Sequence, residues 1–335
     1  ACLPLRMNQA MAYDFGYLID KVRAAPMRDD PFRHLYIPDF FSDEHFRAIV
    51  AAPEIDLPAA GNDDELFDRL FDANYRAVEF PGCTASKDEY LKWRKGGKGA
   101  RYHTACEGFG MTLRLTDPQS PILNELDKFL ASDPFNAAMA ERFGVDLADC
   151  VVDGGIQKYL DGYEISPHPD IRRKAATFMI NINPGSGSEQ RNHHTHYMKF
   201  RPDREYIRHF WEGNEGFDRC WVPWDWCETA YQQTSNNSLV MFSPANDTLH
   251  AVKAHYNHLT SQRTQLYGNL WYRNTPKLRG ARWEKIDLTQ THALPLRDRV
   301  KALLPQEFVQ NIVNYKRDRR GRNKQQNAGR RHEAK

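Results

Sequence analysis

The hydrophobic pattern divides the chain into a first part with helical spacing and a second part rich in short strands. Residues 119–131 carry apolar side chains three and four positions apart, which is the period of a helix with one buried face. Ser120 and Pro121 provide a suitable helix start. A short apolar run over 32–37 predicts a strand, and the charged, glycine-containing stretch 86–101 predicts an exposed loop. Further helices are expected over 43–51, 65–76 and 134–143.

After residue 150, short runs rich in β-branched and aromatic residues alternate with turn residues. These predicted strands are 151–160, 176–182, 238–243, 249–254 and 263–273. Several short strands in series are typical of a β-barrel or jelly roll and not of a parallel sheet. A polar stretch rich in Trp and His, about 185–234, is interpreted as an insertion between the strands.

Composition is that of an ordinary globular protein. The chain has 335 residues, 41% apolar and 27% charged, which excludes a disordered, collagen-like or disulfide-stapled chain. No apolar run approaches the roughly 18 residues of a membrane span. Six cysteines without CxxC spacing, and a start that lacks the apolar core of a signal peptide, predict a cytoplasmic protein with free thiols.

The charge is distributed unevenly along the chain. Residues 316–335 hold nine Lys/Arg and two Asp/Glu, a net of +7, which leaves the remainder of the chain at −5. This tail has no apolar periodicity and is expected to be disordered. The expected organisation is an N-terminal strand with helices that buttress a core (1–150), the β core (151–275), a helical segment (276–315) and the basic tail.

The candidate chemistry lies in the strand-rich part. His168 and Asp170 stand two positions apart at the start of a predicted strand, so their side chains would share one face. Such a triplet alone is usually a surface pair. His250, however, follows a later apolar strand, and Arg263 heads the next one. Two imidazoles and one carboxylate on one face form the facial triad of non-haem Fe(II) oxygenases.

With these residues the chain resembles the Fe(II)- and 2-oxoglutarate-dependent dioxygenases, in the style of their prolyl-hydroxylase-like branch. The resemblance covers about 150–273 and, more loosely, the segment 31–46. It implies a mainly β protein with flanking helices around a double-stranded β-helix (jelly roll, cupin-like) core. It also implies that His168, Asp170 and His250 bind Fe(II), which takes 2-oxoglutarate and O2, with ascorbate as an accessory reductant. Arg263 would then bind the remote carboxylate of 2-oxoglutarate, since a buried anion requires a charged partner.

Three further residues are candidates for the cosubstrate site. Many relatives carry Ser or Thr two positions after the arginine, where this chain has Gln265. Tyr159 matches a tyrosine that family members often carry on the strand before the HxD triplet, where it could hydrogen-bond the cosubstrate. A tyrosine that only packs in the core would give the same sequence pattern. Asn181 lies on the strand after the HxD turn and is expected to face inward. Because Asp170 is present, the resemblance favours hydroxylation over halogenation, with desaturation or ring formation as variants.

The substrate is less well defined by the sequence. Arg172, directly after the HxD triplet, either attracts an acidic group to the cavity mouth or belongs to a solvated turn. Trp224 and Trp226, in a Trp-rich segment with Trp211 and Trp221, either form a lid over the iron or seal the insertion onto the barrel. The histidines of RNHHTHYMKF (191–200) predict an exposed polar loop in preference to a second metal site.

These residues favour an enzyme that hydroxylates a small molecule, such as an amino acid or biosynthetic intermediate. A protein or peptide hydroxylase is the alternative, and a non-catalytic β-barrel binding protein is a weaker one. A nucleic-acid demethylase would need a basic, aromatic cleft for a flipped base. The acidic body of the chain argues against that, so no specific nucleic-acid partner and no membrane span are expected.

Overall fold

The strands of the protein form two antiparallel sheets. The computed structural model describes residues 13–79, 81–96, 105–214 and 217–275, so the expected helical segment 276–315 and the basic tail lie outside the described residues. The strands are β1 (Met27–Arg28), β2 (His34–Ile37), β3 (Tyr75–Ala77), β4 (Thr112–Leu115), β5 (Cys150–Tyr159), β6 (Glu164–His168), β7 (Lys174–Asn181), β8 (Thr195–Phe200), β9 (Cys227–Gln233), β10 (Leu239–Phe242), β11 (His250–Lys253) and β12 (Arg263–Tyr272). The helices are α1 (Tyr17–Ala24), α2 (Asp43–Val50), α3 (Asp63–Asp72), α4 (Lys87–Lys95), α5 (Pro121–Ala131), α6 (Asp133–Phe143) and α7 (Tyr206–Gly213).

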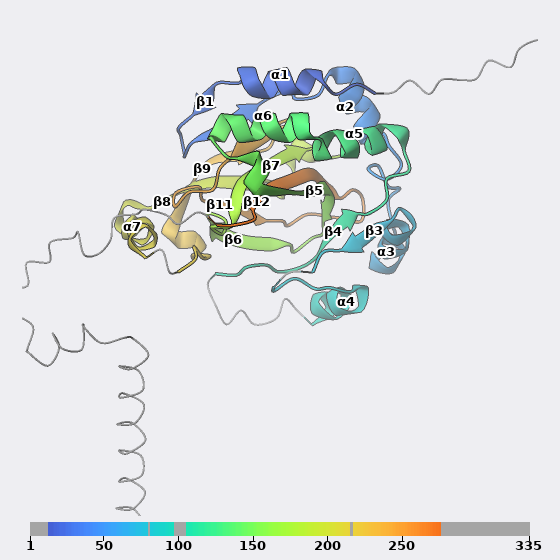
Figure 1. Ribbon diagram of the computed structural model, residues 1–335. Helices are drawn as coiled ribbons and strands as arrows, with labels where there is room; N and C mark the ends of the chain where they lie inside the picture. Colours follow the sequence, from blue (N-terminus) through green and yellow to red (C-terminus); the bar gives the residue numbers. More distant parts are fainter. Residues whose placement is uncertain (1–12, 80, 97–104, 215–216, 276–335) are drawn as a thin grey trace, which may run out of the picture. The chain divides into compact units, whose positions relative to one another are not determined.

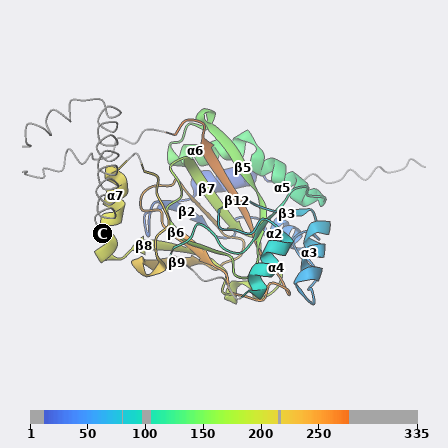
Figure 2. The same cartoon turned by 90° about the horizontal axis from the view of Figure 1, so that it is seen from below.

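The order of the strands is that of a jelly roll. The larger sheet runs β1-β2-β10-β7-β12-β5-β4-β3 and the smaller one β6-β11-β8-β9. From β5 to β12 successive strands change sheet except at the β8–β9 pair, which places β5, β7, β10 and β12 in one sheet and β6, β8, β9 and β11 in the other. Figure 2 shows β5, β7 and β12 side by side in the larger sheet. The predicted double-stranded β-helix core with flanking helices is confirmed.

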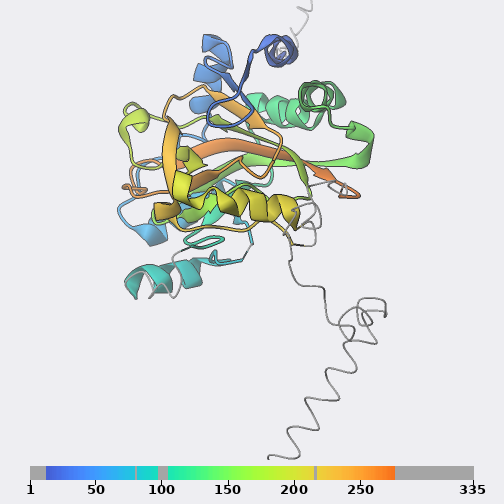
Figure 3. The same cartoon turned by 90° about the vertical axis from the view of Figure 1, so that its left-hand side faces the viewer.

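The expected insertion needs correction, because it contains two strands of the core. β8 and β9 both lie within 185–234 and pair with each other, and β8 also pairs with β11. β9 forms the edge of the smaller sheet, and most of its residues are partly or fully exposed. The polar side chains of such an edge strand hide the strand pattern from the sequence. The segment between β8 and β9, with α7, covers the outer face of the smaller sheet (Figure 3).

The N-terminal helices back the larger sheet. Leu18 of α1, Leu123 of α5 and Phe135 of α6 are fully or almost fully buried, in the same apolar cluster as Leu266 of β12. In Figure 1 α1, α5 and α6 lie together above the sheet. This packing leaves the opposite face of the larger sheet free to line a cavity, and it gives that face a rigid support.

Two other predicted elements differ in the structure. The expected helix 65–76 ends at Asp72, and the chain then enters β3. The expected loop 86–101 contains α4, whose start is capped by Ser86 and Glu89: the Ser86 hydroxyl accepts from the Glu89 amide, and the Glu89 carboxylate accepts from Ala85 N. This capping box and the buried Tyr90 stabilise a helix whose remaining positions are mostly charged.

Two further expectations from the sequence concern membrane-spanning segments and the state of the cysteines. Across the described ranges, no helix combines the length and the apolar character needed to span a bilayer. Of the cysteines within these ranges, Cys83, Cys150, Cys220 and Cys227 are free thiols. The expected free thiols are therefore found for these four.

Candidate metal centre and cavity

Three buried side chains converge between the two sheets. His168 ends β6 and His250 begins β11, and the two residues are direct partners across these paired strands. Asp170 follows two residues after the end of β6. One potential ligand atom from each of the three lies within 4.8 Å of the others, and no other such group of His, Cys, Asp or Glu occurs among the described residues. The side chains predicted to bind a metal are thus brought together.

The local backbone achieves this in a different way from the one expected. The sequence argument placed His168 and Asp170 on one face of a continuous strand, but the strand ends at His168. Asp170 has a φ of 60°, in the left-handed region that Asp tolerates better than most residues. A turn, and not strand alternation, therefore directs the carboxylate toward the histidines.

Hydrogen bonds fix the orientation of both imidazoles. Nδ1 of His168 lies 2.9 Å from the Ser166 carbonyl oxygen, and Nδ1 of His250 lies 3.0 Å from the Thr248 carbonyl oxygen. A carbonyl only accepts, so each Nδ1 carries a proton and each Nε2 is the nitrogen left to face a metal. Burial lowers the pKa of His250 to about 3. The ring of His250 is therefore neutral at pH 7, which is the form that binds metals.

The carboxylate is held ionised and in place. Burial alone would raise the pKa of Asp170, but the Lys174 ammonium and the two imidazoles hold it well below its usual range. Lys174 Nζ lies 2.7 Å from Asp170 Oδ1, and Thr177 Oγ1 lies 3.0 Å from Oδ2. Two imidazole nitrogens and one oriented carboxylate form a donor set that would fit Fe(II).

The triad forms part of the wall of a cavity of ≈ 300 Å³ that also reaches Arg263. Arg263, at the start of β12, is 1% exposed. Its guanidinium lies 4.3 Å from the centre of the Tyr159 ring, and Nη2 donates to Thr195 Oγ1 at 2.9 Å. Nη1 is buried and has no hydrogen-bond partner, and no carboxylate within the described ranges pairs with Arg263. A buried cation with an unused donor fits the carboxylate of a ligand, since an uncompensated buried charge is costly.

The other cosubstrate candidates divide into two groups. Tyr159 and Gln265 line the cavity, whereas Asn181 does not. Gln265 Nε2 donates to Asn181 Oδ1 at 2.8 Å, and Asn181 Nδ2 donates to the Gln233 carbonyl at 2.9 Å. Asn181 therefore links the two sheets and orients Gln265. Thr195, the hydroxyl partner of Arg263, was not found from the sequence because it lies in the stretch interpreted as an insertion.

The predicted substrate residues lie away from the cavity. Arg172 Nη2 donates to the Trp211 carbonyl, and Trp224 Nε1 donates to Glu164 Oε1. Trp224 and Trp226 pack against the apolar cluster beneath α7, so the Trp-rich segment seals onto the smaller sheet. Neither tryptophan, nor Arg172, lines the cavity. In this structure the three side chains make packing and loop-fixing contacts, and a substrate role for them stays a prediction.

Trp221 is the member of this segment that does line the cavity. Its ring stacks over His168 at 6.1 Å between centroids and 29° between planes. Nothing in the sequence separates it from its three neighbouring tryptophans, because their directions depend on how the long segment between β8 and β9 folds.

The histidines of the expected polar loop are mostly buried. His193 Nε2 lies 3.1 Å from the Ser188 carbonyl oxygen, and His194 Nε2 lies 3.1 Å from that of Glu189. The expectation of exposure is wrong for these two residues, which fasten the connection between β7 and β8. Their cluster is not part of any metal-binding group in the described ranges.

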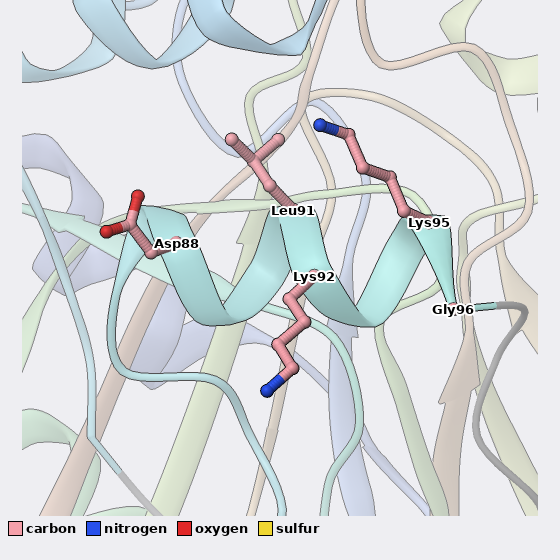
Figure 4. Close-up of a pocket in the computed structure, with 5 residues that line it drawn as sticks. All are labelled: Asp88, Leu91, Lys92, Lys95 and Gly96. Carbon is pink, nitrogen blue, oxygen red and sulfur yellow. The ribbon is translucent and has the colours of Figure 1, made fainter.

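A second hollow lies on the surface of α4. It is lined by Asp88, Leu91, Lys92, Lys95 and Gly96, with a volume of ≈ 560 Å³ (Figure 4). In the close-up its charged side chains project away from one another. It brings no set of metal-ligating or catalytic groups together.

Comparison with known proteins gives no sequence relatives but several structural neighbours. No protein-family model matches the chain, and no curated protein does. A prolyl-4-hydroxylase from Pseudomonas putida is 12% identical with a TM-score of 0.36, over 77% of this chain and 98% of that one. A prolyl hydroxylase from Trichoplax adhaerens, in complex with a hypoxia-inducible-factor peptide, is 8% identical with a TM-score of 0.35, over 76% and 87%. An oxidoreductase of the 2OG-Fe(II) oxygenase family from Burkholderia pseudomallei is 12% identical with a TM-score of 0.30, over 84% and 100%.

These structural neighbours are prolyl hydroxylases and other 2-oxoglutarate–Fe(II) oxygenases, the family that the motifs resemble.

Proposed function

We propose that the protein is an Fe(II)- and 2-oxoglutarate-dependent oxygenase that hydroxylates an unactivated C–H bond of a small molecule. The observation that carries this proposal is one cavity with two complementary features. The imidazole and carboxylate triad lies in its wall, and so does the buried guanidinium of Arg263, which pairs with no carboxylate of the described residues. Together they fit a metal ion and the far carboxylate of a dicarboxylic 2-oxo acid.

Each residue has a defined part in this proposal. His168, Asp170 and His250 hold Fe(II), which with 2-oxoglutarate and O2 supplies the oxidising chemistry, while the oxo acid is converted to succinate and CO2. Arg263 takes the distal carboxylate with Thr195 as second donor, since the Thr195 hydroxyl already contacts the guanidinium. Ascorbate would serve only to keep the iron reduced.

The small-molecule form of the proposal is supported by the dimensions and the walls of the cavity. A volume of ≈ 300 Å³ is in the range of small-ligand pockets, which begin at about 300 Å³. Its walls come from both sheets and from Trp221, so a ligand is surrounded on several sides. A peptide hydroxylase is the competing possibility, which the substrate panel described next would reveal.

The test is succinate formation by the protein reconstituted anaerobically with Fe(II), 2-oxoglutarate and ascorbate, then exposed to O2 with metabolites or peptides. The proposal expects succinate to rise with a small-molecule member of the panel. The signal should vanish in Asp170→Ala and persist in Asp203→Ala, a substitution of a surface carboxylate on the segment before α7. Stimulation by peptides alone would replace the small-molecule assignment, and no succinate with any member would refute the enzymatic one.

A further inference from the structure

The ionic groups of the cavity do not all pair with one another. Apart from the two histidines, its ionisable Asp, Glu, Lys and Arg lining residues are Glu107, Asp153, Asp170, Arg114, Lys174 and Arg263. Lys174 and Asp170 form one pair at 2.7 Å, and Arg114 and Asp153 form another at 2.8 Å. The two that remain are Arg263, proposed above to bind the cosubstrate, and Glu107.

Arg114 is satisfied by more than its ion pair. With the Gln157 amide oriented so that its oxygen faces the guanidinium, that oxygen lies 2.8 Å from Arg114 Nη2 and 3.2 Å from Nε. In the same orientation the Gln157 nitrogen donates to the Tyr159 hydroxyl at 2.7 Å. Arg114 is therefore committed to protein partners, and it does not serve as the counter-charge of Glu107.

Glu107 lines the cavity and pairs with none of the described residues. It is half-buried and lies in the stretch just before β4, and it makes no hydrogen bond or ion pair with any residue in the described ranges. Burial raises the pKa of Glu107, whereas the nearby His168 ring acts in the opposite direction. A partly desolvated carboxylate without a counter-charge is costly, and a cation from a ligand would offset that cost.

The neighbouring wall offers matching contacts. The indole of Trp221 and the rings of Tyr163 and Trp271 line the same cavity, and aromatic faces attract cations. Trp221 Nε1 and Asn269 Nδ2 are buried donors that find no hydrogen-bond partner among the described residues. Both are donors only, so they fit an acceptor such as a carbonyl or carboxylate oxygen on a ligand.

We propose that the substrate carries a cationic nitrogen group, an ammonium or guanidinium, which Glu107 binds, and a hydrogen-bond acceptor that Trp221 and Asn269 bind. This inference rests on the proposed function, because it assigns the substrate of the same metal site. Glu107 acts as a specificity-determining residue: it contacts the substrate and has no part in binding the metal or 2-oxoglutarate.

The experiment uses the full chain loaded with Co(II) and 2-oxoglutarate, a combination that binds ligands without turning over. The probes are n-butylammonium, n-butyramide and n-butyrate, which differ mainly in charge, and their dissociation constants are measured by calorimetry. The native protein should bind butylammonium at least about tenfold more tightly than butyramide, a difference of about 1.4 kcal/mol. Glu107→Gln should abolish that preference, and Glu107→Lys should shift it toward butyrate.

The matched control is Glu228→Gln, which removes an exposed carboxylate on β9 that does not line the cavity, and should leave all three constants unchanged. Equal binding of the three probes by the native protein, or a preference that survives in Glu107→Gln, would overturn the inference. A loss of Co(II) affinity in Glu107→Gln would also overturn it, since the carboxylate would then serve the metal. Failure of the native protein to bind Co(II) and 2-oxoglutarate would instead refute the proposed function.

Discussion

Replacing Arg263 by methionine should separate cosubstrate binding from folding. The substitution keeps most of the buried stem volume and removes the guanidinium, which has one unpaired nitrogen and one bonded to Thr195. A hydrogen bond to a charged group contributes about 1.5–3 kcal/mol. Losing two such bonds to a carboxylate should cost about 3 kcal/mol at the least, which corresponds to a roughly 100-fold weaker affinity for 2-oxoglutarate.

The same variant should not be less stable without ligand. Burial lowers the pKa of Arg263, which means that the charged form is disfavoured in the empty site. Removing an uncompensated buried charge is therefore expected to leave the free energy of unfolding unchanged or to raise it.

The assay is thermal or urea unfolding of the metal-loaded protein with and without 2-oxoglutarate. At a ligand concentration 100 times the native dissociation constant, the native protein should gain about 2.7 kcal/mol. The variant, for which that concentration would only equal its dissociation constant, should gain about 0.4 kcal/mol. Arg263→Lys, which keeps the charge and loses the planar fork, should fall between the two.

The reasoning about Arg263 would be refuted by a 2-oxoglutarate affinity of the methionine variant within about threefold of native, with metal binding intact.

Three further substitutions test other parts of the structure. Thr177→Val removes the hydroxyl that holds Asp170 Oδ2 at 3.0 Å, and should weaken Co(II) binding about tenfold in equilibrium dialysis; unchanged binding would contradict this positioning role. Lys158 is fully buried, and burial lowers its pKa from 10.5 to about 7. The unfolded chain therefore binds more protons above pH 7, and urea stability should rise by about 2.5 kcal/mol from pH 7.5 to 9.5. Lys158→Met should remove that rise, and an equal slope in both proteins would disprove it. Gly110→Ala should destabilise by about 1–2 kcal/mol more than Gly144→Ala, because an added Cβ at Gly110 would lie 2.8 Å from Tyr163 N whereas Gly144 is open; equal melting temperatures would contradict this.

The residues of the metal-binding motif could be predicted because each lies beside a recognisable apolar strand, and these strands follow one another in a fixed order. Apolar strands flank His250 and Arg263, and these strands occur in the structure as β10, β11 and β12. The pattern of a triplet, a later histidine and an arginine one strand further is therefore visible in the sequence.

The missed elements have specific physical reasons. β9 lies at the edge of the smaller sheet and exposes polar residues, so it reads as a loop. The helix α4 depends on its capping box and one buried tyrosine, which its mostly charged sequence conceals. Both are stabilised by contacts that a hydrophobic pattern does not contain.

The missed cavity residues depend on tertiary placement. Thr195, Trp221 and Glu107 come from β8, from the segment after α7 and from the stretch before β4. They meet only when the two sheets face each other. Conversely, Trp224 is close in sequence to Trp221 but does not line the cavity, because its indole donates to Glu164. Arg172 is close in sequence to the triad, but its guanidinium donates to the Trp211 carbonyl instead.

The central claim is that one cavity holds a metal and a 2-oxo acid together. The most direct measurement is an anaerobic calorimetric titration with Fe(II), followed by 2-oxoglutarate, of the native protein and Asp170→Ala. The account predicts one Fe(II) per native chain, binding of 2-oxoglutarate that depends on prior metal, and neither in Asp170→Ala. No Fe(II) binding by the native protein, or equal binding by Asp170→Ala, would contradict it.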